Sequence, residues 1–369
     1  MTVKYKQGKL FVTDINQDDS AESKFFEINN RRYLGNKFKL NSFIKEIVDS
    51  ECGQFDSFAD LFAGTGVVAS LFKDKKLIVN DILYSNFVCH QAWFGTESYD
   101  INKIKQLIEK YNNHNESKEN YFSKNFSNTY FSKKICKKIG FIRQDIENLY
   151  KSSYINEREK FILITSLIYA MDKIANTCGH YDAYRKNSDF NDKLVLLVPK
   201  ITKNNKKNEI YNLEISDLSK CISADVIYLD PPYNSRQYSD SYHLLENVAE
   251  WQKPNIFGVA KKMDRSHIKS DFCTSKAPKA FDNLIQSLDA KYILLSYNNM
   301  GNKGDGRSQA KISDKDILDT LNKKGKVTIF TRSYKAFTTG KSNIEDNEER
   351  VFLCECKKCV NHFNFFCRL

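Results

Sequence analysis

The chain has 369 residues and a formal charge of +11, because 57 Lys and Arg outnumber 46 Asp and Glu. This length allows one large α/β domain with an insertion, or two domains. The apolar run at 161–171 is too short to span a bilayer and the first residues are polar, so we expect neither a membrane protein nor a signal peptide. The ten Cys form no disulfide framework, which places the chain in a cytoplasm. The positive charge favours a polyanionic partner, although a lysine-rich solvated surface would show the same excess.

The first predicted element with a functional pattern is a basic turn that opens a helix. Residues 31–37 read Arg-Arg-Tyr-Leu-Gly-Asn-Lys, and the apolar residues that follow, up to Val48, have helical spacing. Such a turn can place N–H groups and the positive end of the helix dipole against an anionic group. An ordinary helix start would look the same. The candidate binding residues here are Tyr33, Asn36 and Lys37.

A buried strand over 58–62 then leads into a glycine turn. Gly64 and Gly66 let the backbone turn sharply and approach a ligand with no Cβ in the way. A phosphate-binding loop is the competing interpretation, but position 69 is Ala and no Lys-Ser/Thr pair follows. A second strand over 77–79 ends near Asp81, where a carboxylate can accept both hydroxyls of a ribose or simply cap a turn. The candidate binding residues of these two loops are Asp60, Phe62, Ala63, Gly64, Thr65, Gly66, Asp81 and Ile82.

Residues 84–210 interrupt the alternation of strands and helices and are mostly helical by periodicity, with a long helix predicted over 157–178. Aromatic and basic side chains are mixed in this stretch, which suits contacts to nucleic acid as well as a helical subdomain that packs on the sheet. The candidate nucleic-acid contacts here are Lys124, His180, Tyr181 and Arg185. The sheet resumes over 209–215, where Glu214 is a candidate binding residue.

The apolar run 226–229 predicts a buried strand that stops at Asp230-Pro231-Pro232-Tyr233. Two prolines cannot continue a ladder, so the chain makes a rigid turn at the carboxyl end of a strand, where open α/β sheets place ligands. Asp230 and a proline carbonyl can accept two N–H bonds, and Tyr233 can stack on a ring. This set suits a planar substrate with an exocyclic amino group.

The segment after the motif is polar and aromatic and can cover the site. A basic loop with irregular spacing follows over 253–278. The candidate nucleic-acid contacts of these two segments are Arg236, Tyr238, Lys261, Lys262 and Arg265. A strand over 291–297 and an antiparallel pair over 327–330 and 351–356 complete the predicted sheet. The C-terminal set of Cys354, Cys356, Cys359, His362 and Cys367 could ligate zinc, but two of its cysteines share one face of a strand and suit core packing, so we predict no metal site.

The order of basic glycine turn, glycine loop, insertion and Asp-Pro-Pro-Tyr resembles that of DNA-adenine methyltransferases of the Dam-like D12 class. The resemblance implies an α/β fold, a class I methyltransferase-like (Rossmann-like) mixed seven-stranded sheet with a largely helical insertion. It implies a catalytic domain at 1–83 and 211–369 that binds S-adenosylmethionine, with the candidate target-recognition region at 84–210. By the same resemblance, Tyr33, Gly35 and Lys37 hold the methionine end of the cofactor and Glu214 meets its adenine.

The expected substrate is double-stranded DNA at the bacterial nucleoid, methylated on N6 of an adenine that leaves the stack. Asp230, Pro231, Pro232 and Tyr233 are the expected catalytic residues. A cognate restriction endonuclease is a conceivable partner, and the sequence does not distinguish a monomer from a dimer. Two alternatives stay open, namely an RNA or protein-glutamine methyltransferase, and an inactive DNA-binding relative.

Overall fold

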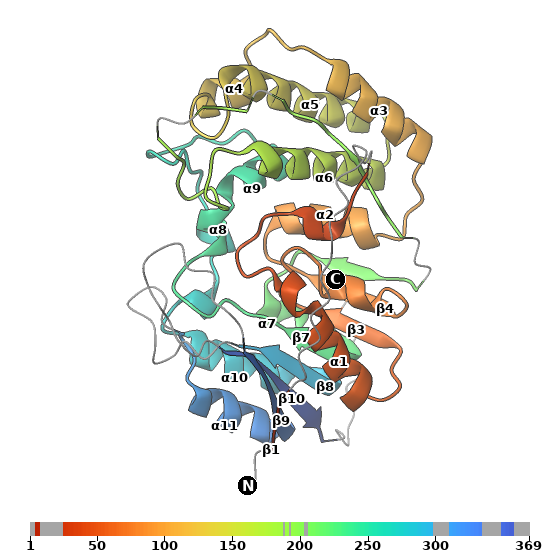
Figure 1. The fold of residues 1–369 in the computed structure, drawn as a ribbon, viewed down its shortest axis with the longest axis vertical. Coiled ribbons are helices and arrows are strands. Elements are labelled where there is room, and N and C mark those ends of the chain that lie inside the picture. Colours follow the sequence, from red (N-terminus) through yellow and green to blue (C-terminus); the bar gives the residue numbers. More distant parts are fainter. Residues whose placement is uncertain are drawn as a thin grey trace.

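An eight-stranded sheet forms the centre of the computed structural model, which describes residues 4–7, 25–186, 189–191, 193–202, 206–297, 310–333 and 348–357 (Figure 1). Its strands, in spatial order, are β1 (Lys4–Gln7), β9 (Gly325–Ser333), β10 (Glu348–Cys356), β8 (Asp289–Ser296), β7 (Ser223–Leu229), β3 (Ser57–Asp60), β4 (Lys76–Asn80) and β6 (Glu209–Tyr211). Strand β10 runs antiparallel to both of its neighbours, and the other pairs are parallel.

The predicted mixed seven-stranded α/β sheet is confirmed, and β1 adds an eighth strand beside β9. The predicted closing pair is the β9–β10 hairpin, in which Val351 lies opposite Phe330. A separate two-stranded sheet joins β2 (Phe25–Phe26) to β5 (Val198–Pro199).

Strand β7 is buried on both faces, which explains its unbroken apolar sequence. Val226 and Tyr228 face one hydrophobic core, whereas Ile227 and Leu229 face the other. Side chains alternate between the faces of a strand, so each face needs its own layer of helices. The end of this central strand is therefore fixed from both sides, and Asp230 follows it directly.

Helices cover the two faces unequally. The larger layer contains α1 (Asn41–Glu51), α2 (Tyr84–Phe94), α3 (Ile101–Asn113), α4 (Tyr121–Phe126), α5 (Lys133–Lys151), α6 (Glu157–Ile174) and α9 (His243–Glu250). The smaller layer contains α7 (Ile215–Leu218), α10 (Ala277–Ser287) and α11 (Asp314–Lys324). Figure 1 shows α3 to α6 stacked at the end of the molecule opposite the β9–β10 hairpin, with α8 (Tyr238–Ser241) between the two ends. Within the described ranges, no helix has the length and apolar character needed to cross a membrane.

Helix α6 starts at a capping box and ends earlier than predicted. The Asn156 side chain accepts a bond from Glu159 N, and Glu159 returns one to Asn156 N. The periodicity predicted a helix to residue 178, but α6 ends at Ile174 because Ala175 adopts extended backbone and Asn176 N donates to Tyr130 O at 2.9 Å. A tertiary contact to the segment after α4 thus replaces the last turn of the predicted helix.

Candidate active site

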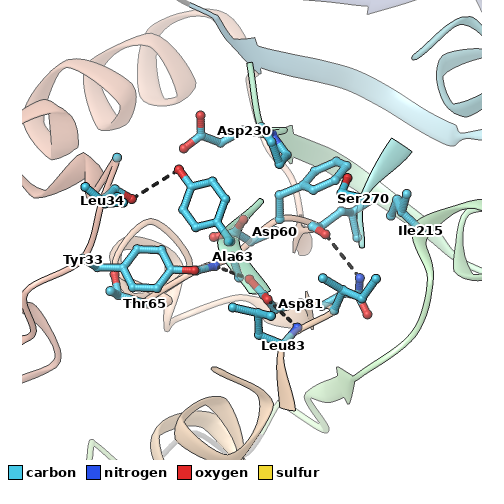
Figure 2. Close-up of a pocket in the computed structure, with 18 of the residues that line it drawn as sticks. Tyr33, Leu34, Asp60, Ala63, Thr65, Asp81, Leu83, Ile215, Asp230 and Ser270 are labelled. Carbon is cyan, nitrogen blue, oxygen red and sulfur yellow. Dashed lines mark hydrogen bonds between the residues drawn. The ribbon is translucent and has the colours of Figure 1, made fainter. Parts of the chain in front are cut away.

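A pocket of about 890 Å³, counted out to its mouth, lies at the carboxyl ends of β3, β4 and β7 (Figure 2). Its wall combines the turn before α1, the loops after β3 and β4, the start of α7, the segment from β7 into α8, and two residues of the 253–278 loop. The place is the one where parallel α/β sheets bind ligands.

The glycine loop after β3 takes its shape from two glycines and one carboxylate. Gly64 and Gly66 have φ values of +54° and +80°, which a side chain would strain. Asp81 Oδ2 accepts a hydrogen bond from Gly64 N at 2.8 Å, and Oδ1 accepts one from Leu83 N at 2.9 Å. Asp81 therefore links the loops after β3 and β4, and it also lines the pocket. Asp81 thus caps the turn, which was one of the two interpretations of its sequence position. The other interpretation, a ribose contact, stays a prediction.

Buried carboxyl groups dominate the polar lining of the pocket. Asp60 is 1% exposed, its Oδ2 accepts from Ala69 N at 3.3 Å, and its Oδ1 has no hydrogen-bond partner among the described residues. Burial raises the pKa of Asp60 well above its usual range, and the nearby Asp230 raises it further. Burial also raises the pKa of Asp81 to about 6. In Figure 2, Asp60 lies between Asp230 and Asp81 on the wall. An unpaired buried acceptor of this kind favours a cationic or hydrogen-bonding ligand.

Lys37 is the cation that faces these acids. Its Nζ lies 3.0 Å from Asp230 Oδ1, and both side chains are mostly buried. Burial by itself lowers the pKa of Lys37, but Asp230 together with Glu349 and two nearby tyrosines outweighs this effect, and the pKa is raised. Burial likewise raises the pKa of Asp230, and Lys37 opposes that rise. The sequence analysis placed both residues at the site but missed their pairing, because no local pattern joins positions 37 and 230.

The rest of the Asp-Pro-Pro-Tyr motif surrounds the mouth. Pro232 lines the pocket, Pro231 is buried, and Tyr233 is half-buried beside it without lining it. The Tyr233 carbonyl accepts a bond from Lys311 N at 2.8 Å, which fixes the end of the motif. The motif is therefore a rigid turn, as predicted, with its carboxylate at the pocket and its ring at the rim.

A stack of aromatic rings supports the basic turn before α1. Tyr33 and Tyr242 are parallel, with ring centroids 4.4 Å apart, and Tyr242 Oη accepts from Leu34 N at 2.7 Å. Arg31 lies beside this stack and donates to Asn86 Oδ1 at 2.8 Å. The sequence analysis named Tyr33 and missed Arg31 and Tyr242, whose partners are distant in the chain.

Most of the predicted binding residues meet at the pocket. Those that line it are Tyr33, Asn36, Lys37, Asp60, Phe62, Ala63, Gly64, Thr65, Asp81, Ile82, Glu214, Asp230 and Pro232. Gly66 is not among the lining residues. The lining residues that sequence reasoning missed include Leu83, Ile268, Gln237 and Ser270. Gln237 and Ser270 exchange two hydrogen bonds of 3.0 and 2.9 Å between side chain and backbone. Apolar or neutral residues in a loop carry no signal that would have identified them.

The predicted nucleic-acid contacts divide into exposed and buried groups. Lys124, Arg185 and Arg236 are exposed, and Lys261 and His180 are half-buried. These five stay predictions, because exposure allows a contact to DNA but does not identify one.

One of the predicted contacts is wrong in its placement. Tyr181 is 2% exposed and donates to Asp172 Oδ1 at 2.7 Å, so it is a core residue that cannot stack on a base. Its polar neighbours in the sequence made this tyrosine look like a surface residue.

Tyr238 lines the pocket, with its ring centroid 5.6 Å from that of Tyr33, which agrees with a segment that covers the site. Its contact with DNA stays a prediction.

Lys262 and Arg265 are paired with acids. Lys262 Nζ bonds to Asp182 and lies 3.8 Å from Asp240, while Arg265 bonds to Asp240 at 2.8 Å. These two cations anchor the 253–278 loop to α8, which the sequence alone did not indicate.

The C-terminal cysteines are only partly described. Cys354 is buried on β10 and its Sγ donates to Leu321 O at 3.5 Å, which is the core-packing alternative. Cys359, His362 and Cys367 lie outside the described residues. In the part of the chain that the structure describes, no three His, Cys, Asp or Glu side chains are grouped so as to hold a metal ion.

The mixed sheet, the glycine loop after β3 and the pocket at the strand ends define a class I methyltransferase-like α/β protein. The profile of the D12 class N6 adenine-specific DNA methyltransferase family matches residues 33–301, and the chain belongs to this family. The family resemblance inferred from the motifs is thereby confirmed, and the DNA interpretation is favoured over the RNA and protein-glutamine alternatives.

Curated relatives are modification methylases. The chain is 35% identical over 343 residues to "Modification methylase StsI" of Streptococcus sanguinis, a match that covers 86% of this chain and 50% of that protein. It is 31% identical over 335 residues to "Type II methyltransferase M.NlaIII" of Neisseria lactamica, a match that covers 87% of this chain and 97% of that protein. It is 33% identical over 289 residues to "Type II methyltransferase M.FokI" of Planomicrobium okeanokoites, a match that covers 73% of this chain and 45% of that protein. The chain thus spans about half of two of these relatives and nearly all of the third.

Proposed function

We propose that this chain transfers the methyl group of S-adenosylmethionine to N6 of an adenine that has left the stack of duplex DNA. The observation that carries the proposal is the position of Asp230, at the pocket end of the central strand and paired with Lys37. Family membership supplies the substrate class.

The pocket fits a cationic methyl donor by its donor and acceptor chemistry. When bound, S-adenosylmethionine supplies an electrophilic methyl group on a positively charged sulfur. Four carboxylates line the pocket, those of Asp60, Asp81, Glu214 and Asp230, against the single ammonium of Lys37 among the described lining residues. Asp60 Oδ1 offers an unpaired acceptor, and the Asp81 carboxylate lines the pocket after β4 and can accept from the hydroxyls of a ribose. Glu214 precedes α7 at the wall, where it can accept from an adenine amino group.

The substrate side of the site rests on the Asp-Pro-Pro-Tyr turn. Asp230 accepts one N6–H bond and the Pro231 carbonyl accepts the other, which directs the nitrogen lone pair towards the methyl donor. Tyr233, at the rim, stacks on the extruded base. N6 loses one proton overall in the reaction, and the Asp230 carboxylate is the acceptor beside it. Positioning and electrostatics therefore account for most of the catalysis.

The test is transfer of labelled methyl groups from S-adenosylmethionine to unmethylated genomic DNA, followed by sequencing that reads N6-methyladenine. We expect label at one short motif with the wild-type chain, and none with Asp230→Ala. Asp217→Asn, which alters an exposed carboxylate on α7, is the matched control and should leave the rate unchanged. Tight binding of S-adenosylmethionine without transfer to DNA would refute the proposal.

We also propose that the methylated motif protects DNA from a cognate endonuclease, in line with the names of the relatives. DNA methylated by this chain, digested with endonucleases that recognise the mapped motif, should resist cleavage. DNA treated with Asp230→Ala should be cut. Equal cleavage of both samples would contradict a protective role.

A further inference from the structure

The turn at 257–262 carries the two most exposed large apolar side chains among the described residues. Phe257 is 66% exposed and Val259 is 75% exposed. Phe257 and Lys262 exchange backbone hydrogen bonds of 2.7 and 2.9 Å, and Gly258 has a φ of +70°. The chain therefore makes a tight turn that projects two apolar groups into solvent. Two exposed apolar side chains within one short turn offer a hydrophobic contact to another molecule.

The base of this turn is held firmly, although its tip is exposed. Tyr130 Oη donates to Ala260 O at 2.8 Å. Lys262 pairs with Asp182, and Arg265 binds Asp240 of α8 at 2.8 Å. Helix α8 also carries Tyr238, which lines the active-site pocket. The turn at 257–262 is thus held at its base, in part by α8, and α8 also contributes to the wall of the active-site pocket.

The turn also adjoins the pocket on its other side. Phe257, Lys262 and Lys269 line a shallow, open concavity. Lys269 stands between Ile268 and Ser270, both of which line the active-site pocket. Residues 268–270 therefore contribute to the walls of both hollows.

The surroundings of the tip are basic. Residues 253–270 contain five Lys or Arg and one Asp, and two of these cations, Lys262 and Arg265, are paired with Asp182 and Asp240. Lys269 is exposed and Lys261 is half-buried. This charge suits a phosphate backbone, whereas an apolar patch for a protein partner is normally depleted of Lys at its centre.

We propose that Phe257 and Val259 form a wedge that packs between the bases of duplex DNA and holds open the gap left by the extruded adenine. The proposal rests on the proposed function and assigns positioning residues to it. Apolar side chains that enter a stack offset the loss of base stacking, and lysines around them neutralise the adjacent phosphates. Neither Phe257 nor Val259 lines the active-site pocket, so we expect the effect of the wedge to be confined to extrusion of the base.

The test compares wild type with the double variant Phe257→Ala/Val259→Ala on two synthetic duplexes. Both duplexes carry the recognition motif with its target adenine unmethylated. One duplex is fully paired, and the other has an abasic site opposite the target adenine, which removes the pairing that extrusion must break. We expect kcat/KM of the double variant to fall roughly tenfold on the paired duplex, in line with the energy of base–aromatic stacking, and to recover to within about twofold of wild type on the abasic duplex.

Tyr154→Ala is the matched control, because Tyr154 is also exposed (53%). It precedes the start of α6, whereas Asp182, which pairs with Lys262 of the turn, follows the end of that helix. It should behave as wild type on both duplexes. Affinity for S-adenosylmethionine, measured by calorimetry, should be the same in all three proteins and reports that the variants fold. An equal loss on both duplexes, or no loss, would overturn the wedge. Inactivity of wild type on both duplexes would instead overturn the proposed function.

Discussion

The Lys37 ammonium lies 3.0 Å from the Asp230 carboxylate, although one residue precedes α1 and the other follows β7. The pair joins the basic turn to the Asp-Pro-Pro-Tyr motif across the pocket. Lys37 opposes the rise that burial causes in the pKa of Asp230, so it favours the ionised carboxylate, which is the form that accepts N6–H. It also holds that carboxylate in place before a substrate arrives.

Replacing Lys37 by Met should move the acidic limb of the pH–rate profile to higher pH. The reason is that loss of the cation lets burial raise the pKa of Asp230 further, so protonation occurs at a higher pH. We expect kcat at neutral pH to fall at least about tenfold, which corresponds to about 1.4 kcal/mol in the barrier. Lys37→Arg retains the charge and should restore the position of the limb. A limb that stays in place in Lys37→Met would show that Lys37 does not act through Asp230.

Affinity for S-adenosylmethionine should fall when the pH drops below about 6. Burial raises the pKa of Asp81 to about 6. In the ligand-free folded protein, Asp81 therefore takes up a proton as the pH falls through about 6, whereas the same side chain in an unfolded chain would still be ionised at that pH. A protonated Asp81 has lost acceptor capacity for a ribose, so ligand binding must displace that proton. We expect the dissociation constant to rise up to about tenfold per pH unit below 6. Calorimetry across this range is the measurement, and Asp81→Asn should bind weakly with little dependence on pH.

Glycine-to-alanine substitutions at positions 66 and 53 separate crowding from backbone strain. Both residues have positive φ, +80° and +58°. A Cβ on Gly66 would lie 3.0 Å from the Phe94 ring and 3.1 Å from the His90 ring, whereas a Cβ on Gly53 meets nothing within 4 Å. We expect Gly53→Ala to cost about 1 kcal/mol of unfolding free energy from φ alone, and Gly66→Ala to cost about 1–3 kcal/mol more.

Denaturant titration gives the two unfolding free energies, and calorimetry gives the affinity for S-adenosylmethionine. Only Gly66→Ala should weaken binding, because its crowding displaces the loop that lines the pocket. Similar losses at both positions would mean that the loop around Gly66 relaxes freely.

Arg31 should couple energetically to Asp172. The Arg31 side chain is buried and its Nε lies 3.2 Å from Asp172 Oδ2. Arg31→Met leaves a buried carboxylate with less compensation and should cost about 3–5 kcal/mol, whereas the double variant Arg31→Met/Asp172→Asn should cost less than the sum of the single changes. Unfolding in urea measures all three. Strict additivity would show that the pair is not an interacting unit.

The residues that sequence reasoning found share one property, namely that their role is set by their immediate neighbours. Gly64 is required by the turn in which it lies, and Asp230 is presented by the strand before it and the prolines after it. Such positions can be recognised from a few consecutive residues, and the alternation of apolar runs was enough to predict the sheet around them.

The residues that sequence reasoning missed or misplaced depend on contacts between distant segments. Tyr181 is buried between segments that are distant in the chain. It bonds to Asp172 of α6 and to Ser241 of α8, and its polar neighbours give no sign of this. Lys262 and Arg265 are basic residues whose partners, Asp182 and Asp240, come from two other segments. A sequence shows the sign of a charge but not the carboxylate that the fold brings to it.

The strand order also determines when this molecule can be completed during translation. Strand β7 lies between β3, made long before it, and β8, made after it, while β1 pairs with β9, which is made much later. A nascent chain can therefore pair β3 with β4 early, but Asp230 acquires its place only when the central strand has left the ribosome. The strand that is synthesised first among the described elements waits longest for its neighbour, so the edge of the sheet closes only after the site has formed.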